Sequence, residues 1–332
     1  MWTALALFLI KSVFILVAIV FVIVLIAWMI RQNRHTLRVE SLNDHYDSLR
    51  DALRSEVWSS KQIKKYFKGR SDVAKNDNPE NKRKIYVLDF DGDINASDVS
   101  SLRESVSAIL GVASHHDEVV VRLESPGGVV HGYGLAASQL LRVRHAGLRL
   151  TVCVDKVAAS GGYMMACVAD TVIAAPFAIV GSIGVVAQIP NVHRLLTRAG
   201  VDYEEATAGE FKRTVSFLGK ISDEGRKKFQ EQLEDTHGLF KEFVHTHRPM
   251  VDVTRVSTGE YWFGERALAL HLVDRLQTSD DYIISQLETA LVLKVHYEEP
   301  QSLRDKVVRT VGTAFEHALE RMIDVSARAK FF

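Results

Sequence analysis

Between residues 85 and 154 the sequence alternates short apolar runs with segments of helical periodicity, and this alternation constrains the fold more than any other feature. The apolar runs, which predict strands, cover residues 85–90, 119–123 and 148–154. The segments between them, at 99–110 and 130–143, repeat apolar residues every three or four positions and predict helices. Strands that alternate with helices of this length favour βαβ units and a mainly parallel sheet covered on both faces. We therefore expect an α/β fold.

The second half of the sequence continues this pattern. Residues 171–191 carry no charge, but two prolines and two glycines interrupt them, so we expect short buried strands and turns rather than a membrane span. A long helix is predicted to begin at Ser222, with two acidic residues in its first turn, and to end before Pro249. Residues 259–276 predict a turn, a short helix and a closing strand.

The amino-terminal stretch has a different character. Residues 12–30 form a run of 19 residues without a charge, nearly all of them apolar. A helix of this length spans roughly 28 Å, close to the hydrocarbon thickness of a bilayer. The sequence before Arg31 has no small-residue cleavage site of the signal-peptide kind, so we expect a retained transmembrane anchor within residues 1–35. Arginines after the run favour a cytoplasmic domain, but this rule is weak for long domains and leaves the side of the membrane open.

Three further regions follow the anchor. Residues 36–83 combine a charged stretch of helical character, 36–68, with a polar linker, and predict an amphipathic stalk and a linker. Residues 84–300 hold the alternating strands and helices and form the expected globular domain. Residues 301–332 predict a C-terminal amphipathic helix, whose apolar stripe suits packing on the domain, on another subunit or on the membrane surface.

Composition argues against several classes of function. Lys+Arg and Asp+Glu both number 41, so the net charge is zero, whereas a nucleic-acid-binding protein usually has a basic face. Two cysteines are too few for a disulfide framework, and because Cys153 and Cys167 lie in apolar runs we expect buried thiols. The histidine spacings fit no zinc motif. We expect no metal, no nucleotide cofactor and no nucleic-acid partner.

Two glycine-rich turns follow predicted strands, where the ligands of open α/β sheets bind. In ESPGG, residues 124–128, the proline fixes one backbone angle and the glycines allow an open turn whose N–H groups point outward. In AASGG, residues 158–162, Ser160 lies between a strand and a helix, where its hydroxyl is exposed and the N–H of Gly161 is free. Each turn, considered alone, also fits ordinary close packing, so both interpretations stay open on this evidence.

A serine becomes a good nucleophile only when a neighbouring base takes its proton. No histidine in the sequence has flanking residues that place it beside Ser160. A lysine serves instead in a Ser-Lys dyad when desolvation lowers its pKa. Lys212, in the segment AGEFKRT, is one candidate, and Lys156 and Lys220 compete with it. Since most lysines are simply solvated, these spacings do not choose among the three.

Five segments in this order resemble the signal peptide peptidase A (protease IV) family: ESPGG, DKVAASGGYMMA, GSIGV, AGEFKRT and YWFGERALALHLVD. The resemblance covers nearly the whole chain. It implies the ClpP/crotonase type of α/β fold, with repeated ββα/βαβ units after one N-terminal transmembrane helix, and it makes residues 84–300 a peptidase domain. It also implies a serine endopeptidase in which Ser160 is the nucleophile, Lys212 is the general base and Ser182 orients the lysine amine.

The same resemblance assigns the oxyanion hole and decides among the lysines. The backbone N–H groups of Gly128 and Gly161 would stabilise the oxyanion, with Gly127 as the less favoured alternative to Gly128. Lys156, although nearer to Ser160 in sequence, is set aside.

Members of the family assemble their sites between catalytic units. A chain with one unit is then expected to form a ring-like homo-oligomer in which Ser160 and Lys212 come from neighbouring subunits. The substrates implied are signal peptides and other membrane or misfolded polypeptides. The location implied is the inner (cytoplasmic) membrane of a bacterium, where the N-terminal helix contacts lipid.

Two other functions compete with a protease. An acyl-CoA enzyme of the crotonase fold uses an oxyanion hole but needs neither a serine nucleophile nor a paired lysine, so the AASGG and AGEFKRT segments speak against it. A non-catalytic membrane scaffold would use the stalk and the C-terminal helix as its working parts.

Overall fold

The computed structural model describes residues 16, 20, 36–74 and 82–298. Two units divide the chain, one of residues Val39–His296 and one of residues Met1–Arg38 with Tyr297–Phe332. The expected C-terminal helix over 301–332, and all but two residues of the expected transmembrane anchor over 1–35, lie outside the described residues. Among the helices of the described part, none has both the length and the apolar character of a membrane span.

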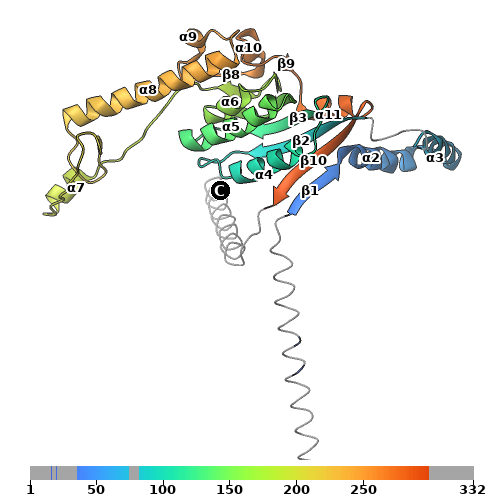
Figure 1. The fold of residues 1–332 in the computed structure, drawn as a ribbon, viewed down its shortest axis with the longest axis horizontal. Coiled ribbons are helices and arrows are strands. Elements are labelled where there is room, and N and C mark those ends of the chain that lie inside the picture. The colour runs from blue at the N-terminus through green and yellow to red at the C-terminus, as the bar shows by residue number, and fades with distance from the viewer. Residues whose placement is uncertain (1–15, 17–19, 21–35, 75–81, 299–332) are drawn as a thin grey trace, which may run out of the picture. The chain divides into compact units, whose positions relative to one another are not determined.

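A seven-stranded sheet forms the centre of the main unit (Figure 1). In spatial order its strands are β1 (Thr36–Ser41), β10 (Ala290–Glu298), β2 (Arg83–Asp91), β3 (Glu118–Glu124), β4 (Arg149–Val154), β6 (Thr171–Ala174) and β9 (Arg275–Leu276). Every pairing from β10 to β9 is parallel, which confirms the prediction of a mainly parallel sheet and an α/β fold. The carboxyl ends of β2, β3 and β4 therefore lie at one edge.

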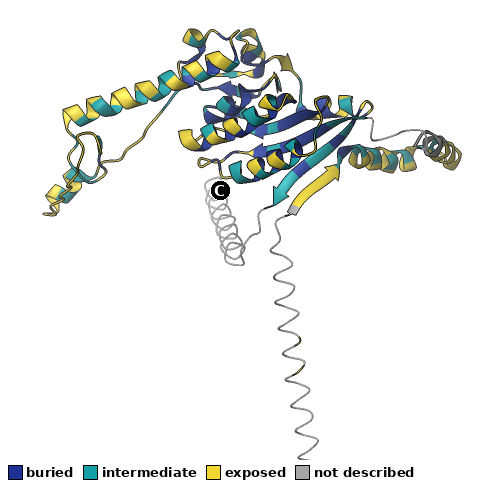
Figure 2. Ribbon diagram, viewed as in Figure 1, coloured by how far each residue is buried: buried dark blue, intermediate teal, exposed yellow. Residues whose placement is uncertain are grey.

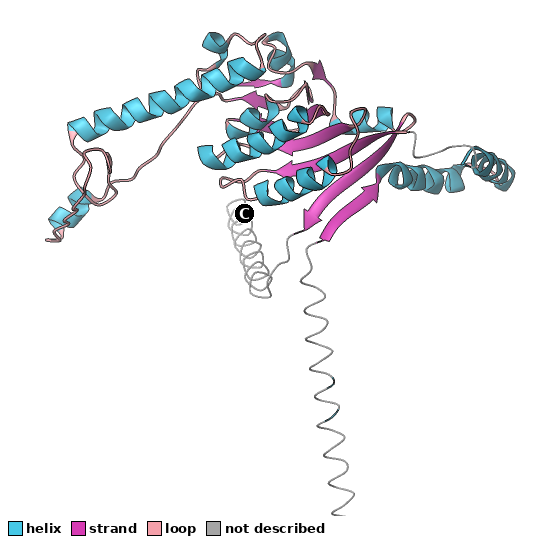
Figure 3. Cartoon of the chain, viewed as in Figure 1, coloured by secondary structure: helices cyan, strands magenta, loops and turns pink. Residues whose placement is uncertain are grey.

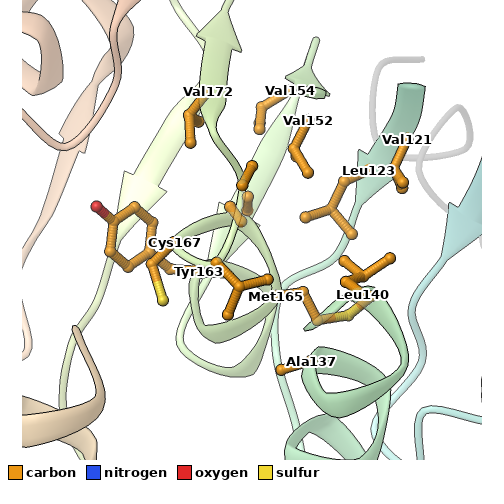
Figure 4. Close-up of a cluster of buried hydrophobic side chains, with 14 of the residues drawn as sticks. Val121, Leu123, Ala137, Leu140, Val152, Val154, Tyr163, Met165, Cys167 and Val172 are labelled. Atoms are coloured by element: carbon orange, nitrogen blue, oxygen red, sulfur yellow. The ribbon is translucent and has the colours of Figure 1, made fainter. Parts of the chain in front are cut away.

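Helices cover both faces of this sheet. Because side chains alternate along each strand, neighbouring residues of one strand enter different cores. Tyr86, Leu88 and Phe90 of β2 belong to a core with α4 (Val99–Leu110), α5 (Val130–His145) and α6 (Gly161–Ala166). Ile85 and Val87 point the other way, into a second core with the start of α2 (Leu42–Val57) and with α11 (Ser279–Gln286). Figure 2 shows the central strands buried between these layers and the edge strand β1 exposed, and Figure 4 shows side chains of β3, β4, β6, α5 and α6 packed together.

A smaller sheet lies beside the carboxyl edge of the main one. Its strands are β5 (Val157–Ala159), β7 (Ile179–Gly181) and β8 (Tyr261–Phe263), with β5 and β7 parallel and β8 antiparallel to β7. Ser125, directly after β3, forms an isolated parallel bridge with Ala158 of β5, so the two sheets meet at this point. After β8, α10 (Gly264–Ala269) leads back to the main sheet.

A long excursion leaves this body between β7 and α9 (Val253–Val256) and contains α7 (His193–Arg198) and α8 (Asp223–His247) (Figure 3). Ser222 begins α8 as predicted, and its hydroxyl accepts the N–H of Gly225. The helix ends at His247, before Pro249, as expected. Only Phe240 and Val244 of α8 are buried, so only its C-terminal half packs on the body. We call residues 185–230 the arm.

Three predictions about local structure were wrong in part. The stretch 36–68, expected to be helical, is helical from Leu42 onward, as α2 and the start of α3 (Ser60–Ala74), but its first six residues form strand β1. The start of α2 packs on the sheet, where the Asn43 amide donates to the carbonyls of Leu287 and Ala290. Residues 185–190, expected to be buried with the rest of 171–191, are half-buried or exposed because they begin the arm. The segment 259–276, expected to hold a turn, a short helix and a closing strand, also contains strand β8 at Tyr261–Phe263, which was not predicted. Both cysteines are buried as predicted, and burial raises the pKa of Cys153 to about 12.

Candidate active site

Ser160 lies between β5 and α6, as the sequence predicts, in a backbone conformation that few residues adopt. Its φ of 53° and ψ of −118° place a non-glycine residue in a strained region of backbone space. Two hydrogen bonds hold it there: its N–H donates to the carbonyl of Gly181 at 2.8 Å, and its carbonyl accepts the N–H of Met164 at 3.0 Å. The residue is half-buried, so a fixed backbone holds it at a position that is partly accessible to solvent.

Ser182 occupies the equivalent position on the neighbouring strand. Ala159 of β5 pairs with Gly181 of β7, so the two serines follow paired residues on strands about 4.8 Å apart. Ser182 has the same unusual backbone, with a φ of 52°, and its N–H donates to the carbonyl of Glu260 at 2.8 Å. The structure thus brings these two candidate residues together at one end of the small sheet.

The turn at residues 125–128 lies directly against Ser160. A Cβ placed on Gly127, whose φ is 90°, would come within 2.7 Å of the Ser160 Cβ and 2.8 Å of the Gly161 nitrogen, so only glycine fits. The N–H of Gly127 donates to the Ser125 hydroxyl at 3.1 Å and is therefore occupied. In contrast, the N–H groups of Gly128 and Gly161 donate to no other residue that the structure describes. Two amide donors without an acceptor in the described part of the chain therefore stand near Ser160: Gly161 directly follows it, and Gly128 directly follows the glycine that contacts it.

The glycines after Ser160 also serve close packing. A Cβ on Gly161 would lie 2.3 Å from the ring of Tyr133, and a Cβ on Gly162 would lie 2.6 Å from the carbonyl oxygen of Ser125. Both contacts are too close for any side chain. The two interpretations left open by the sequence are consequently compatible, because the packing that excludes side chains also leaves the Gly161 N–H uncovered.

Lys212 lies in the arm and is exposed. The arm residues around it pack on the start of α8: the carbonyl oxygen of Thr214 would be 2.3 Å from a Cβ on Gly225. Phe240, the first buried residue of α8, comes fifteen positions after Gly225 on the same helix, which corresponds to about 22 Å. No hydrogen bond joins Lys212 to Ser160 or Ser182 among the described residues. A single chain therefore groups the serines and the glycine N–H groups but not Lys212.

Lys156, the competitor nearest in sequence, is engaged elsewhere. Its Nζ lies 2.8 Å and 3.0 Å from the two carboxylate oxygens of Glu124. This hydrogen-bonded ion pair raises the pKa of Lys156, which keeps the amine protonated and makes it a poor base. Lys220, the third candidate, is exposed in the arm. In the described part of the chain no group of His, Cys, Asp and Glu is arranged to hold a metal ion.

Models of one protein family match almost the whole chain. "Peptidase family S49 N-terminal" matches residues 1–140, and "Peptidase family S49" matches residues 142–293. The "Probable protease SohB" of Buchnera aphidicola subsp. Schlechtendalia chinensis is 47% identical over 299 residues, which cover 85% of this chain and 98% of that protein. This chain belongs to peptidase family S49.

A second relative of the S49 chain is the "Probable protease SohB" of Haemophilus influenzae. It is 59% identical over 230 residues, which cover 69% of this chain and 65% of the relative, so the match spans just under two thirds of that relative's length. Among solved structures, a mutant of the "1510-N membrane-bound stomatin-specific protease" in complex with a substrate peptide is similar, with a TM-score of 0.43 and 12% identity over 70% of this chain and 98% of that one.

As a member of peptidase family S49 the chain is a protease of the serine type, and its substrates are polypeptides. The resemblance found in the sequence motifs is confirmed at the level of the family. The acyl-CoA enzyme and the non-catalytic scaffold are correspondingly disfavoured.

Sequence reasoning missed the side chains that support the turn at residues 125–128. Ser125 is fully buried and hydrogen-bonds Tyr133, which is also fully buried and lies on α5. Ser125 stands inside the ESPGG motif, but nothing in the local pattern links it to a tyrosine eight residues later. The one available signal was a polar residue between a buried strand and a glycine turn.

Proposed function

We propose that this S49 protease uses Ser160 as its nucleophile and Lys212 as its general base, with Ser182 orienting the lysine amine. The observation that carries the proposal is the pair of free N–H groups, of Gly128 and Gly161, beside a serine held in a strained conformation. Donors prearranged around a developing oxyanion are among the largest contributions to catalysis. Since the Gly127 N–H is occupied, Gly128 is the better assignment in this turn.

The reaction follows in two stages. The Ser160 Oγ attacks the carbonyl carbon of the scissile peptide bond while the Lys212 amine takes the hydroxyl proton. The oxyanion that forms accepts hydrogen bonds from Gly128 and Gly161, the C–N bond breaks, and the lysine returns its proton to the leaving amine. In the second stage Lys212 takes a proton from water, which attacks the acyl ester, and Ser160 regains a proton as it leaves.

The exposed position of Lys212 supports a mechanism in which subunits must assemble before the site is complete. In one chain its segment lies at the far end of α8 from the body, whereas a base must come within hydrogen-bond reach of the nucleophile. We therefore assign the lysine of each site to a neighbouring subunit of a ring-like homo-oligomer. Head-to-tail contacts of this kind close into rings when the rotation between subunits permits it.

Further parts of the proposal rest on the sequence and the element order. The parallel sheet with a second small sheet at its carboxyl edge supports a ClpP/crotonase type of fold for residues 84–300. Residues 12–30 are the proposed membrane anchor within 1–35, followed by the stalk and linker over 36–83, with a C-terminal amphipathic helix over 301–332. The protein would then be held in a bacterial inner membrane through lipid contact. Its substrates would be signal peptides or other membrane or misfolded polypeptides.

A fluorophosphonate probe tests the nucleophile directly, because it reacts covalently with activated serines. The full chain is labelled and the modified peptide is identified by mass spectrometry. We expect labelling at Ser160, loss of labelling in Ser160→Ala and Lys212→Ala, and unchanged labelling in Lys156→Ala. Labelling that persists in Ser160→Ala would overturn the assignment of the nucleophile. Loss in Lys156→Ala with retention in Lys212→Ala would overturn the assignment of the base.

A further inference from the structure

A chain of hydrogen bonds lies beneath the candidate oxyanion hole. The Ser125 and Tyr133 hydroxyl oxygens are 2.6 Å apart, and the Tyr133 hydroxyl donates to the carbonyl of Asp93 at 2.7 Å. The Gly127 N–H donates to the Ser125 hydroxyl oxygen at 3.1 Å. Ser125 and Tyr133 are fully buried, so water does not compete for these bonds.

The direction of every bond in the chain follows from counting protons. A tyrosine hydroxyl has one proton, and that of Tyr133 goes to the Asp93 carbonyl, which can only accept. The proton between the two hydroxyls must therefore come from Ser125. The Ser125 oxygen is then left as the acceptor for the Gly127 N–H. The order is Gly127 N–H to Ser125, Ser125 to Tyr133, and Tyr133 to the Asp93 carbonyl.

Tyr133 also contacts the other side of the oxyanion hole. Its ring lies against Gly161, where any Cβ would come within 2.3 Å of the ring. One side chain thus supports the turn that carries Gly128 through its hydroxyl, and the start of α6 that carries the Gly161 N–H through its ring. Gly92, at the end of β2, leaves room for this arrangement, since a Cβ there would lie 2.4 Å from the Ser125 hydroxyl oxygen.

We propose that Tyr133 is a positioning residue that sets the two oxyanion donors relative to Ser160. This inference rests on the proposed function and deepens it. By binding the Gly127 N–H through Ser125, the chain fixes which way the peptide units of the turn point, and it leaves the Gly128 N–H to the oxyanion. Without the tyrosine hydroxyl, the Ser125 proton loses its acceptor and turns to the nearest carbonyl, which releases the Gly127 N–H and rotates the turn.

Tyr133→Phe tests this role because it keeps the ring against Gly161 and removes only the hydroxyl. We expect kcat to fall by about tenfold to a hundredfold with KM nearly unchanged, since a small displacement of an oxyanion donor acts on the transition state. The affinity for a peptide aldehyde, which forms a tetrahedral adduct with the serine, should fall by a similar factor. Ser125→Ala should do the same, and the double variant should be no worse than either single one, because both break one chain.

Tyr163→Phe is the matched control. Tyr163 is also fully buried, stands three residues after Ser160, and donates to the carbonyl of Leu272 at 3.0 Å, away from the turn. It should lower the melting temperature about as much as Tyr133→Phe while leaving kcat near the wild-type value. An equal loss of kcat in Tyr163→Phe, a rise in KM alone in Tyr133→Phe, or additive losses in the double variant would each overturn the inference.

The failure of this inference is distinguishable from the failure of the proposed function. If Ser160 is not the nucleophile, the fluorophosphonate probe does not label it in the wild-type chain. If Ser160 is the nucleophile but Tyr133 plays no positioning part, the probe labels wild-type and Tyr133→Phe chains at the same rate.

Discussion

The residues around Ser160 and the residues around Lys212 differ in almost every physical respect. Ser160 lies among buried strands and helices, and hydrogen bonds fix both its own backbone and the adjoining glycine turn. In the arm, residues 185–230, all of which the structure describes, Ser216 is the one buried residue. The arm is held mainly to itself, for example by the Asn191 amide, which donates to the carbonyls of Ser216 and Gly219.

This difference shows that one chain preorganises only half of the proposed dyad. A nucleophile and two oxyanion donors need fixed geometry, and the packed body supplies it. The arm instead exposes apolar side chains, including Leu195, Phe211 and Phe217. Exposed apolar side chains that lie together are typical of surfaces that contact another protein. Under the proposed mechanism, contact with a second subunit would bury the arm and order Lys212 beside Ser160. Substitutions in the two regions should therefore have very different effects, and the four below run from the largest to the smallest.

The largest effect is expected for the base. Lys212→Ala should lower kcat by about 10³-fold or more, because loss of one member of a catalytic dyad removes most of the benefit of the other. Lys156→Ala and Lys220→Ala are controls of the same type and should stay within a few-fold of the wild type. Peptide hydrolysis by the purified full chain measures all three variants. A comparable loss of kcat in either control would contradict the assignment of Lys212 as the general base.

The second effect concerns the attachment of α8 to the body. The buried Arg248 guanidinium donates two hydrogen bonds of 2.8 Å to Asp274 and one of 2.9 Å to the His271 carbonyl. Arg248→Ala removes these three hydrogen bonds, while Asp274, whose side chain is 38% exposed, keeps the N–H of Val172, so the fold should be destabilised by about 2 kcal/mol. Denaturant unfolding measures this, and Arg255→Ala, at an exposed position, is the control. Equal midpoints for the two variants would mean that α8 is not anchored there.

The third effect depends on pH and lies within the packed body. Burial raises the pKa of Asp98 to about 6, so between pH 4 and 6 the folded protein holds a proton that the unfolded chain has lost. Stability from this group is therefore present below pH 4 and is lost as the pH rises through 6. Asp98→Asn should stabilise the protein by about 1 kcal/mol at pH 8, allowing for solvent screening, and by almost nothing at pH 4.

Asp93→Asn is the control of opposite sign. Hydrogen bonds from the backbone and hydroxyl of Ser97 lower the pKa of Asp93. Its substitution should therefore destabilise the protein at pH 8. Unfolding midpoints measured at both pH values check the pair, and a stabilising effect of Asp98→Asn that does not change with pH would contradict the electrostatic explanation.

The smallest effect on folding is expected in the arm. Leu195 is 66% exposed, so Leu195→Ser should change the free energy of unfolding of one chain by less than about 0.5 kcal/mol. The buried Leu140 provides the contrast, since Leu140→Ala should cost about 2–5 kcal/mol. Leu195→Ser should nevertheless shift the protein toward monomers in sedimentation velocity. If Leu195→Ser lowered the free energy of unfolding by more than about 2 kcal/mol without changing the oligomeric state, Leu195 would instead be packed inside a single chain.

The sequence predicted those parts of the fold that depend on local patterns. The strands at 85–90, 119–123 and 148–154, and the start of α8 at Ser222, are readable because apolar periodicity and helix capping act over a few residues. The strand β1 was not readable, since its place beside β10 depends on residues some 250 positions away. Leu37 and Val39 alternate with polar residues, but the run is only six residues long and both apolar side chains are exposed.

The candidate site divides in the same way. The AASGG and ESPGG segments predict the positions of Ser160 and the glycine turn. They are recognisable because a position with positive φ and no room for a Cβ, such as Gly127, accepts only glycine. The chain through Ser125, Tyr133 and the Asp93 carbonyl joins three elements, and no local signal marks it. The separation of Lys212 from Ser160 in one chain is likewise a tertiary property that spacing alone does not reveal.

Mixing two inactive variants tests whether each site takes its serine from one subunit and its lysine from the next. Ser160→Ala and Lys212→Ala chains are dissociated, combined in equal amounts and reassembled, and peptide hydrolysis is then measured. If sites form between subunits, about one quarter of them receive both a wild-type serine and a wild-type lysine, and activity recovers to about that fraction. If the dyad lies within each chain, no site is complete, and the mixture stays as inactive as either variant alone.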